Sequence, residues 1–304
     1  MITIPEIEDG KWFNARRCPS FRNKVVLVDF FSYSCANCVR TMPYLRRWWN
    51  WYKDHDFVMI GIHTPEFEFE KDPSNVKQAL ADLEIEWPVV MDNDRENWEN
   101  FANKYWPAKY IADKSGKLVY EHFGEGAYEK TEKIIQKLLG DEGLPEITKE
   151  KHGDVCFRPT PELYCGYHRG QLNNVGGHFF DTTETYELPD RIDSDSVALK
   201  GSFYADPEYV ESREDTSELF AKFHALEVNL VIHPIGETVI KVKFDHQSIP
   251  DDIAGDDVKD SELIVDRPRM YNLLKADHSV KGTLSLRPIK GNFQAFAFTF
   301  SGCN

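Results

Sequence analysis

The sequence contains no apolar run that approaches the roughly 18 residues a transmembrane helix requires, so we expect no transmembrane segment in this chain. It also lacks a basic excess, because 36 Lys and Arg residues stand against 51 Asp and Glu residues and the net charge is −15. An acidic chain is repelled by phosphate backbones and anionic lipids. The composition therefore argues against nucleic acid as a partner.

The N-terminus lacks the pattern of a secretory signal peptide. The segment MITIPEIEDGKWFN carries acidic residues where a signal peptide has a basic and then an apolar segment. Two locations are compatible with this observation. The protein is cytoplasmic if Met1 is the native start, and extracytoplasmic (periplasmic or at the cell surface) if a leader or anchor was removed.

Cysteine is sparse, and only Cys35 and Cys38 form a C-x-x-C pair. A structural zinc site usually needs a second such pair or a spaced pair of histidines, and the sequence offers neither. We therefore expect no metal, and no cofactor other than a redox-active disulfide formed by this pair.

The other four cysteines give less guidance. Cys156 and Cys165 lie nine residues apart. They either form a local disulfide in an oxidising compartment or remain two unpaired thiols. The positions of Cys18 and Cys303 predict no pairing.

Strands and helices alternate in the first half of the chain. Short runs rich in Val, Ile and Phe predict buried strands, and apolar residues at three- and four-residue steps predict helices. The expected strands are 24–32, 56–64, 87–92 and a hairpin over 108–123, and the expected helices are 39–53, 74–85, 95–105 and 127–140. This order predicts an α/β domain with a mainly parallel sheet and a terminal antiparallel hairpin.

The pattern changes after a polar segment, residues 141–154, which contains one Pro and two Gly and is the expected linker. Beyond it, short β-type runs are separated by turn residues, and helical periodicity is nearly absent. This pattern is typical of an all-β sandwich such as a jelly roll. We therefore expect two domains, residues 1–145 and 146–304.

The C-x-x-C pair lies between a predicted buried strand and a predicted helix. At a helix N-terminus the first sulfur meets free N–H groups and the positive end of the helix dipole, which stabilise a thiolate. The second sulfur lies one turn further on and can attack a mixed disulfide. We therefore expect Cys35 to be the nucleophile and Cys38 the resolving thiol of a thiol-disulfide oxidoreductase.

Residues around this pair resemble the thioredoxin superfamily. Asp29 lies on the strand before the pair, Pro43 lies within the helix after it, and Trp106-Pro107 opens a predicted strand. The sequence is most similar to the TlpA- and DipZ-like branch. The segments that carry this resemblance are 33–44, 61–72, 105–113, 122–128, 160–167 and 267–274.

The resemblance implies roles for these residues. Asp29 would be the buried proton acceptor that helps deprotonate Cys38, and Pro43 would be the helix-kinking proline. Pro107 would be a cis-proline beside the active-site sulfurs, with Trp106 next to it on the substrate-binding surface. The second domain would be a β-sandwich similar to carbohydrate-binding modules.

The sequence departs from the family pattern in three ways. The dipeptide inside the pair is Ala-Asn rather than the Gly-Pro of thioredoxin, and Ser34 replaces the Trp that usually precedes the first Cys. The membrane domain of full-length DipZ proteins is absent from this chain. These departures leave the redox potential and the direction of electron transfer open.

Two further sets of residues carry alternative interpretations. His63 and Glu66 follow the second predicted strand, where the carboxyl ends of parallel strands line a crevice. They either tune Cys35 or contact substrate, or they only cap and solvate a loop. The aromatic residues Phe203, Tyr204 and Tyr209 either form a sugar-stacking platform or fill the core of the sandwich.

Three functions fit the sequence. The first is thiol-disulfide exchange with a protein or small-molecule disulfide, for which an unidentified donor supplies the electrons. The second is a thiol-dependent peroxidase of the AhpC/TSA kind, whose P-x-x-x-[T/S]-x-x-C pattern is met by Ser32 but broken by Val28. The third is a non-catalytic protein whose sandwich binds a glycan or another partner.

Overall fold

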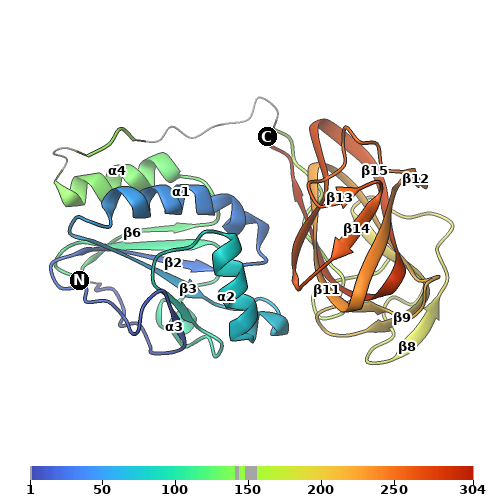
Figure 1. Ribbon diagram of the computed structural model, residues 1–304, viewed down its shortest axis with the longest axis horizontal. Helices are drawn as coiled ribbons and strands as arrows, with labels where there is room; N and C mark the ends of the chain where they lie inside the picture. The colour runs from blue at the N-terminus through green and yellow to red at the C-terminus, as the bar shows by residue number, and fades with distance from the viewer. Residues whose placement is uncertain (1, 141–143, 148–155, 304) are drawn as a thin grey trace. The chain divides into compact units, whose positions relative to one another are not determined.

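The computed structural model describes residues 2–140, 144–147 and 156–303 (Figure 1). The chain divides into two compact units, residues 1–151 and 152–304. The expected linker, residues 141–154, lies mostly outside the described residues, and the expected boundary between residues 145 and 146 falls beside the same gaps.

The first unit is built on one sheet of six strands in the order β1-β4-β3-β2-β5-β6. The pairs β2–β3 and β3–β4 are parallel, and the remaining pairs are antiparallel. The strands are β1 (Trp12–Phe13), β2 (Val25–Phe31), β3 (Phe57–His63), β4 (Val89–Met91), β5 (Ala108–Ala112) and β6 (Leu118–Phe123). The parallel pairs and the terminal hairpin β5–β6 are as predicted. The sheet is mixed rather than mainly parallel, because β5 and the edge strand β1, which was not predicted, add further antiparallel pairs.

The central strand β2 is buried along its whole length. Val25, Leu27 and Phe31 pack into a cluster on one face of the sheet, and Val26 and Val28 pack into a cluster on the other face. Side chains alternate between the two faces of a strand, so a continuous apolar run fits only a strand that is covered on both sides.

Helices cover both faces of this sheet (Figure 1). They are α1 (Ala36–Tyr52), η1 (Glu68–Lys71), α2 (Pro73–Asp82), α3 (Glu96–Asn100) and α4 (Tyr128–Leu139). The helix α1 buries Met42, Leu45 and Trp48, and Pro43 lies in its interior as expected. The helix predicted at 95–105 is much shorter, since Ala102 takes a positive φ of 49° that does not continue a right-handed helix.

The second unit consists of antiparallel β-strands, and its described residues contain no α-helix. The strands are β7 (Leu163–Tyr164), β8 (Thr183–Tyr186), β9 (Ser196–Ala205), β10 (Val210–Ser212), β11 (Glu218–Phe244), β12 (Gln247–Ser248), β13 (Val258–Lys259), β14 (Glu262–Val265) and β15 (Arg269–Ser301). The expected all-β character is confirmed. The more specific jelly-roll arrangement stays a prediction.

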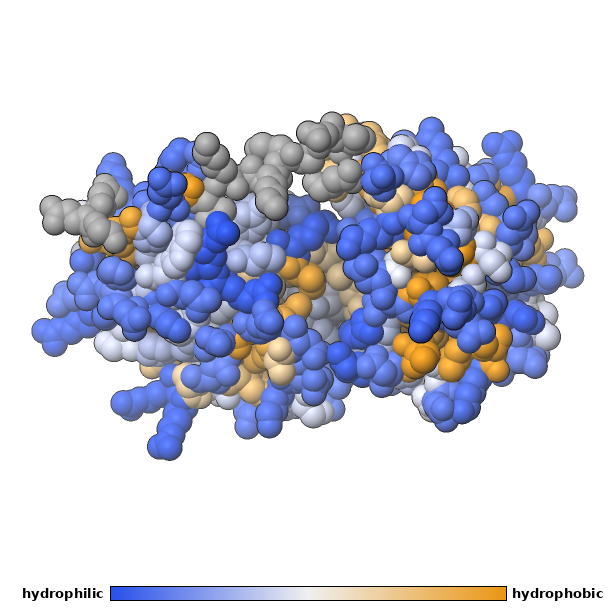
Figure 2. Space-filling view, turned by 45° about the horizontal axis from the view of Figure 1, so that its top comes forward, coloured by the Kyte–Doolittle hydropathy of each residue, from blue (hydrophilic) through white to orange (hydrophobic). Residues whose placement is uncertain are grey.

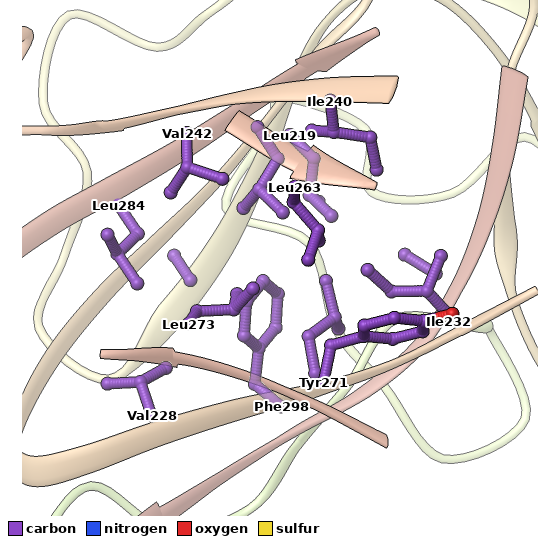
Figure 3. Packing of buried hydrophobic residues seen from close by; sticks show 14 of the residues in the cluster. Leu219, Val228, Ile232, Ile240, Val242, Leu263, Tyr271, Leu273, Leu284 and Phe298 are labelled. Carbon is purple, nitrogen blue, oxygen red and sulfur yellow. The ribbon is translucent and has the colours of Figure 1, made fainter. Parts of the chain in front are cut away.

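The long strands β11 and β15 organise the core of this unit. Leu230 of β11 pairs with Tyr271 near the start of β15 and with Phe298 near its end. Leu263, Leu284 and other side chains gather into one apolar cluster with these residues (Figure 3). Phe203 is also completely buried in this cluster. Phe203 is therefore a core residue. It cannot belong to a sugar-stacking platform with Tyr204 and Tyr209, so that interpretation is wrong for Phe203.

A disulfide joins the two ends of the second unit. Cys156 is bonded to Cys303, and the two residues face each other in an isolated antiparallel bridge. Cys165 is a free, completely buried thiol. The local pairing of Cys156 with Cys165 is therefore wrong, because Cys165 points into the core of the unit instead.

The molecular surface seen in Figure 2 is mostly hydrophilic, with hydrophobic areas between hydrophilic side chains. This agrees with the high content of charged residues, 29% of the chain. Within the part of the chain that the structure describes, no helix is long and apolar enough to cross a bilayer.

Candidate active site

The cysteines of the C-x-x-C pair lie where β2 leads into α1. Cys35 is the N-cap residue of α1, and its backbone N–H donates to the carbonyl oxygen of Ser32 over 3.3 Å. Cys35 is partly exposed, whereas Cys38 is completely buried, and both are free thiols. A disulfide that approaches from solvent can therefore reach the first sulfur but not the second.

The buried Cys38 thiol resists ionisation. Burial raises its pKa well above the ordinary value, and a hydrogen bond with Cys35 and the nearby charges of Cys35 and Asp29 add to this increase. A thiol reacts as its thiolate. Cys38 therefore needs a proton acceptor before it can attack a mixed disulfide.

Asp29 lies in the middle of β2 and is completely buried. Burial raises the pKa of its carboxyl group to about 7, although the charge of Lys109 opposes the increase. A group with this pKa exchanges protons readily near neutral pH. Asp29 also interacts electrostatically with Cys38, so a carboxyl group that titrates near neutral pH lies close to the buried thiol.

Lys109 on β5 is the direct neighbour of Asp29 in the antiparallel register between β2 and β5. It is completely buried, its Nζ lies 5.6 Å from the ring centroid of Tyr128, and burial lowers its pKa while Asp29 and Cys38 oppose that shift. Neither the Asp29 carboxylate nor the Lys109 Nζ has a hydrogen-bond partner among the described residues. The sequence alone did not predict this buried lysine.

The peptide bond between Trp106 and Pro107 is cis, in agreement with the resemblance. Pro107 is buried and Trp106 is half-buried. The indole Nε1 of Trp106 donates to the carbonyl oxygen of Thr64 over 3.1 Å, and its ring lies 4.4 Å from that of Trp98. The residues after β3 and before β5 are thereby held together.

A second buried cluster centres on Glu70, a residue of η1 whose side chain is completely buried. Its Oε1 accepts hydrogen bonds from Ser34 and, over 3.0 Å, from Ser32. Its Oε2 accepts the backbone N–H of Glu66 over 3.3 Å and lies 3.4 Å from Nε2 of His63. Four residues from three segments thus converge on one carboxylate.

His63 and Glu66, both expected near the site, occupy different environments. His63 is completely buried and stacks on Tyr33, with ring centroids 5.4 Å apart. Glu66 is partly exposed. His63 therefore faces neighbouring side chains of the fold rather than solvent, and of the two residues Glu66 is the one that reaches solvent.

The geometry described above is that of a thioredoxin-like redox domain followed by a β-rich domain, and comparisons with known proteins agree. The Redoxin family matches residues 7–139, and the family described as "Thioredoxin like C-terminal domain" matches residues 160–301. The chain belongs to the redoxin family of the thioredoxin superfamily of thiol-disulfide oxidoreductases.

Individual relatives cover different parts of the chain. Protein DipZ of Mycobacterium tuberculosis is 33% identical over 287 residues, which are 92% of this chain and 39% of DipZ. Thiol-disulfide oxidoreductase YkuV of Bacillus subtilis is 30% identical over 141 residues, which are 45% of this chain and 95% of YkuV. The solution structure of a thioredoxin-like protein in its oxidised form is 28% identical, covers 46% of this chain and 95% of its own, and has a TM-score of 0.41. The chain thus spans about two fifths of the DipZ protein that it matches.

Proposed function

We propose that this protein exchanges disulfides through Cys35 and Cys38. The observation that carries the proposal is the pairing of a partly exposed Cys35 at the N-terminus of α1 with a buried Cys38 one turn later. The buried Asp29 and Lys109 beside them support it. YkuV, which shares the first unit almost completely, is named a thiol-disulfide oxidoreductase.

The first half-reaction begins with the Cys35 thiolate. It attacks one sulfur of a substrate disulfide, an S–S bond forms between Cys35 and the substrate, and the other substrate sulfur leaves as a thiolate. Asp29 then accepts the proton of Cys38. The Cys38 thiolate attacks Cys35, releases the second substrate thiolate and leaves a Cys35–Cys38 disulfide, so two electrons have passed to the substrate.

The second half-reaction restores the dithiol. A donor that carries two thiols reduces the Cys35–Cys38 disulfide by the same steps in reverse, and the donor becomes oxidised. Lys109 acts as the counter-charge in both halves, because Asp29 and Cys38 share one proton and whichever of them is ionised would otherwise be an uncompensated anion in a dry site. We further propose protein disulfides as substrates, held by Trp106, Pro107 and Glu66.

The same arrangement disfavours the peroxidase alternative. A peroxidase needs one activated thiol that attacks peroxide, whereas here a resolving thiol lies one turn away and is matched to its own proton acceptor. Glycan or partner binding by the second unit stays a separate proposal. Sugar stacking in that proposal would depend on Tyr204 and Tyr209 alone, because Phe203 is buried in the core.

Equilibration in glutathione buffers of graded redox potential tests the proposed function. We expect a reversible two-electron transition of the Cys35–Cys38 pair, detected by thiol alkylation and peptide mass. Cys35→Ser should remove that transition. Absence of a reversible transition in the unmodified protein would contradict the proposal, and turnover supported only by peroxide would favour the peroxidase.

A further inference from the structure

Glu70 has no part in the chemistry proposed above, and yet it is among the most completely buried side chains of the first unit. A buried carboxylate is costly to desolvate unless strong hydrogen bonds surround it. Breaking a hydrogen bond to a buried polar group leaves that group unsatisfied, which costs more than an ordinary hydrogen bond contributes. The contacts that Glu70 receives should therefore fix their donors firmly.

These donors belong to the segments that frame the nucleophile. Ser32 and Ser34 directly follow the end of β2 at Phe31, and Ser34 is the residue directly before Cys35. The carbonyl oxygen of Ser32 also accepts the backbone N–H of Cys35. Movement of either serine would thus move the backbone that carries the Cys35 sulfur.

The other contacts of Glu70 fasten it to the neighbouring strand. His63 is the last residue of β3, and it pairs with Phe31 in the parallel register between β2 and β3. Its Nε2 lies beside Glu70 Oε2, which also accepts the N–H of Glu66. The carboxylate therefore links the segment before Cys35 to the loop that carries Glu66.

We propose that Glu70 is the positioning residue of the nucleophile, and that it holds the Ser32–Ser34 segment so that the Cys35 sulfur stays within reach of Cys38. The inference rests on the proposed function and deepens it. Two thiols form a disulfide in proportion to their effective concentration, which depends on how well their geometry is fixed. Loosening this segment should therefore make the Cys35–Cys38 disulfide less stable.

The test measures the equilibrium constant for the Cys35–Cys38 disulfide against glutathione in Glu70→Gln. Glutamine keeps one acceptor oxygen for the serines but presents an NH₂ group where the N–H of Glu66 needs an acceptor. The matched control is Glu132→Gln. Glu132 is also a completely buried carboxylate of the first unit, and it accepts a hydrogen bond from the hydroxyl group of Tyr52 rather than from the residues before Cys35.

We expect Glu70→Gln to lower this constant about tenfold, which equals about 30 mV for a two-electron couple. Glu132→Gln should stay within twofold of the unmodified protein, although both variants should lower Tm. Ser34→Ala removes one donor without changing charge, and it should lower the constant about threefold. This variant keeps the test decisive if Glu70→Gln does not fold.

Two results would overturn the inference. The first is a lower Tm with an unchanged constant in Glu70→Gln, which would make Glu70 a purely structural residue. The second is an unchanged constant in Ser34→Ala. A failure of the proposed function looks different, since the unmodified protein itself would then show no reversible disulfide.

Discussion

The two units of this protein bury very different side chains. The first unit encloses several ionisable groups, namely Asp29, His63, Glu70, Asp92, Lys109 and Glu132. In the described part of the second unit, Glu211 is the one charged side chain that is buried, and the core consists of aliphatic and aromatic residues. Both units fold around apolar clusters, so the difference lies in what else the cores contain.

This difference separates stability from chemistry. A buried charge lowers stability unless it is fully compensated, and strongly shifted pKa values gather at functional sites. Asp29 and Lys109 lie beside Cys38 and lack hydrogen-bond partners among the described residues. The second unit has an apolar core and a covalent bond between its ends. The stability of the first unit should therefore depend on pH, and that of the second unit on the Cys156–Cys303 disulfide.

The largest expected effect is on exchange itself. Cys35→Ser should lower the rate of disulfide exchange by about 10³-fold or more, because the attacking thiolate is removed. Reduction of a chromogenic disulfide measures this rate. Cys18→Ser, which changes a half-buried thiol of the same unit, is the control and should keep normal activity. Substantial exchange by Cys35→Ser would contradict the proposed nucleophile.

The next effect concerns the stability of the first unit. The pKa of Asp29 is raised to about 7 from 3.8, so the ionised group opposes folding. Asp29→Asn should leave stability almost unchanged below pH 4 and increase it progressively between pH 4 and 7. The gain should reach at most about 4 kcal/mol, from about three pKa units at about 1.4 kcal/mol each.

Urea unfolding at several pH values measures this gain, and mass spectrometry of trapped mixed disulfides checks the chemistry of the same variant. The variant should also accumulate the mixed disulfide, because Cys38 loses its proton acceptor. A stability gain that is the same at pH 4 and pH 8 would show that the carboxyl group is not shifted as described.

The next prediction concerns the second unit and removes its Cys156–Cys303 disulfide. Cys156→Ala together with Cys303→Ala should lower the free energy of unfolding of this unit by about 2–5 kcal/mol. Exchange by the first unit should be unchanged. Thermal unfolding with and without reductant measures the loss, and in the double variant the unfolding of the second unit should no longer depend on reductant. Equal stability of the variant and the oxidised protein would argue against this pairing.

The smallest expected effect comes from replacing the buried Lys109. Lys109→Met keeps the length and apolar stem of the side chain and removes the charge that lowers the pKa of Asp29. The pKa of Asp29 should rise further, and the pH at which resolution reaches half its maximal rate should increase by about one unit. Stopped-flow measurement of mixed-disulfide decay gives this profile. Lys114→Met, which changes an exposed lysine paired with Asp56, is the control.

The sequence allowed most of the first unit to be predicted because its signals are local. The apolar run around Asp29 predicts β2, and the periodicity of Met42, Leu45 and Trp48 predicts α1. Resemblance supplied the cis bond at Pro107, which local reasoning treats only as the start of a strand. The edge strand β1, just two residues long, carries no pattern of its own.

The features that sequence reasoning missed depend on contacts between distant segments. Lys109 looks like an ordinary solvent-facing lysine until the register of β5 against β2 places it beside Asp29. Glu70 lies in a polar stretch, where a glutamate is usually exposed. Cys156 and Cys303 are 147 residues apart, and spacing alone cannot pair thiols over such a distance.

The bond between Cys156 and Cys303 also gives the second unit a mechanical property. It closes the chain into a loop between these two residues. A pull applied to the chain before Cys156 and after Cys303 is therefore carried by a covalent bond and bypasses the strands inside the loop. Under oxidising conditions this unit would transmit force without extending, and after reduction the same pull would act on its β-sheet and could unravel it.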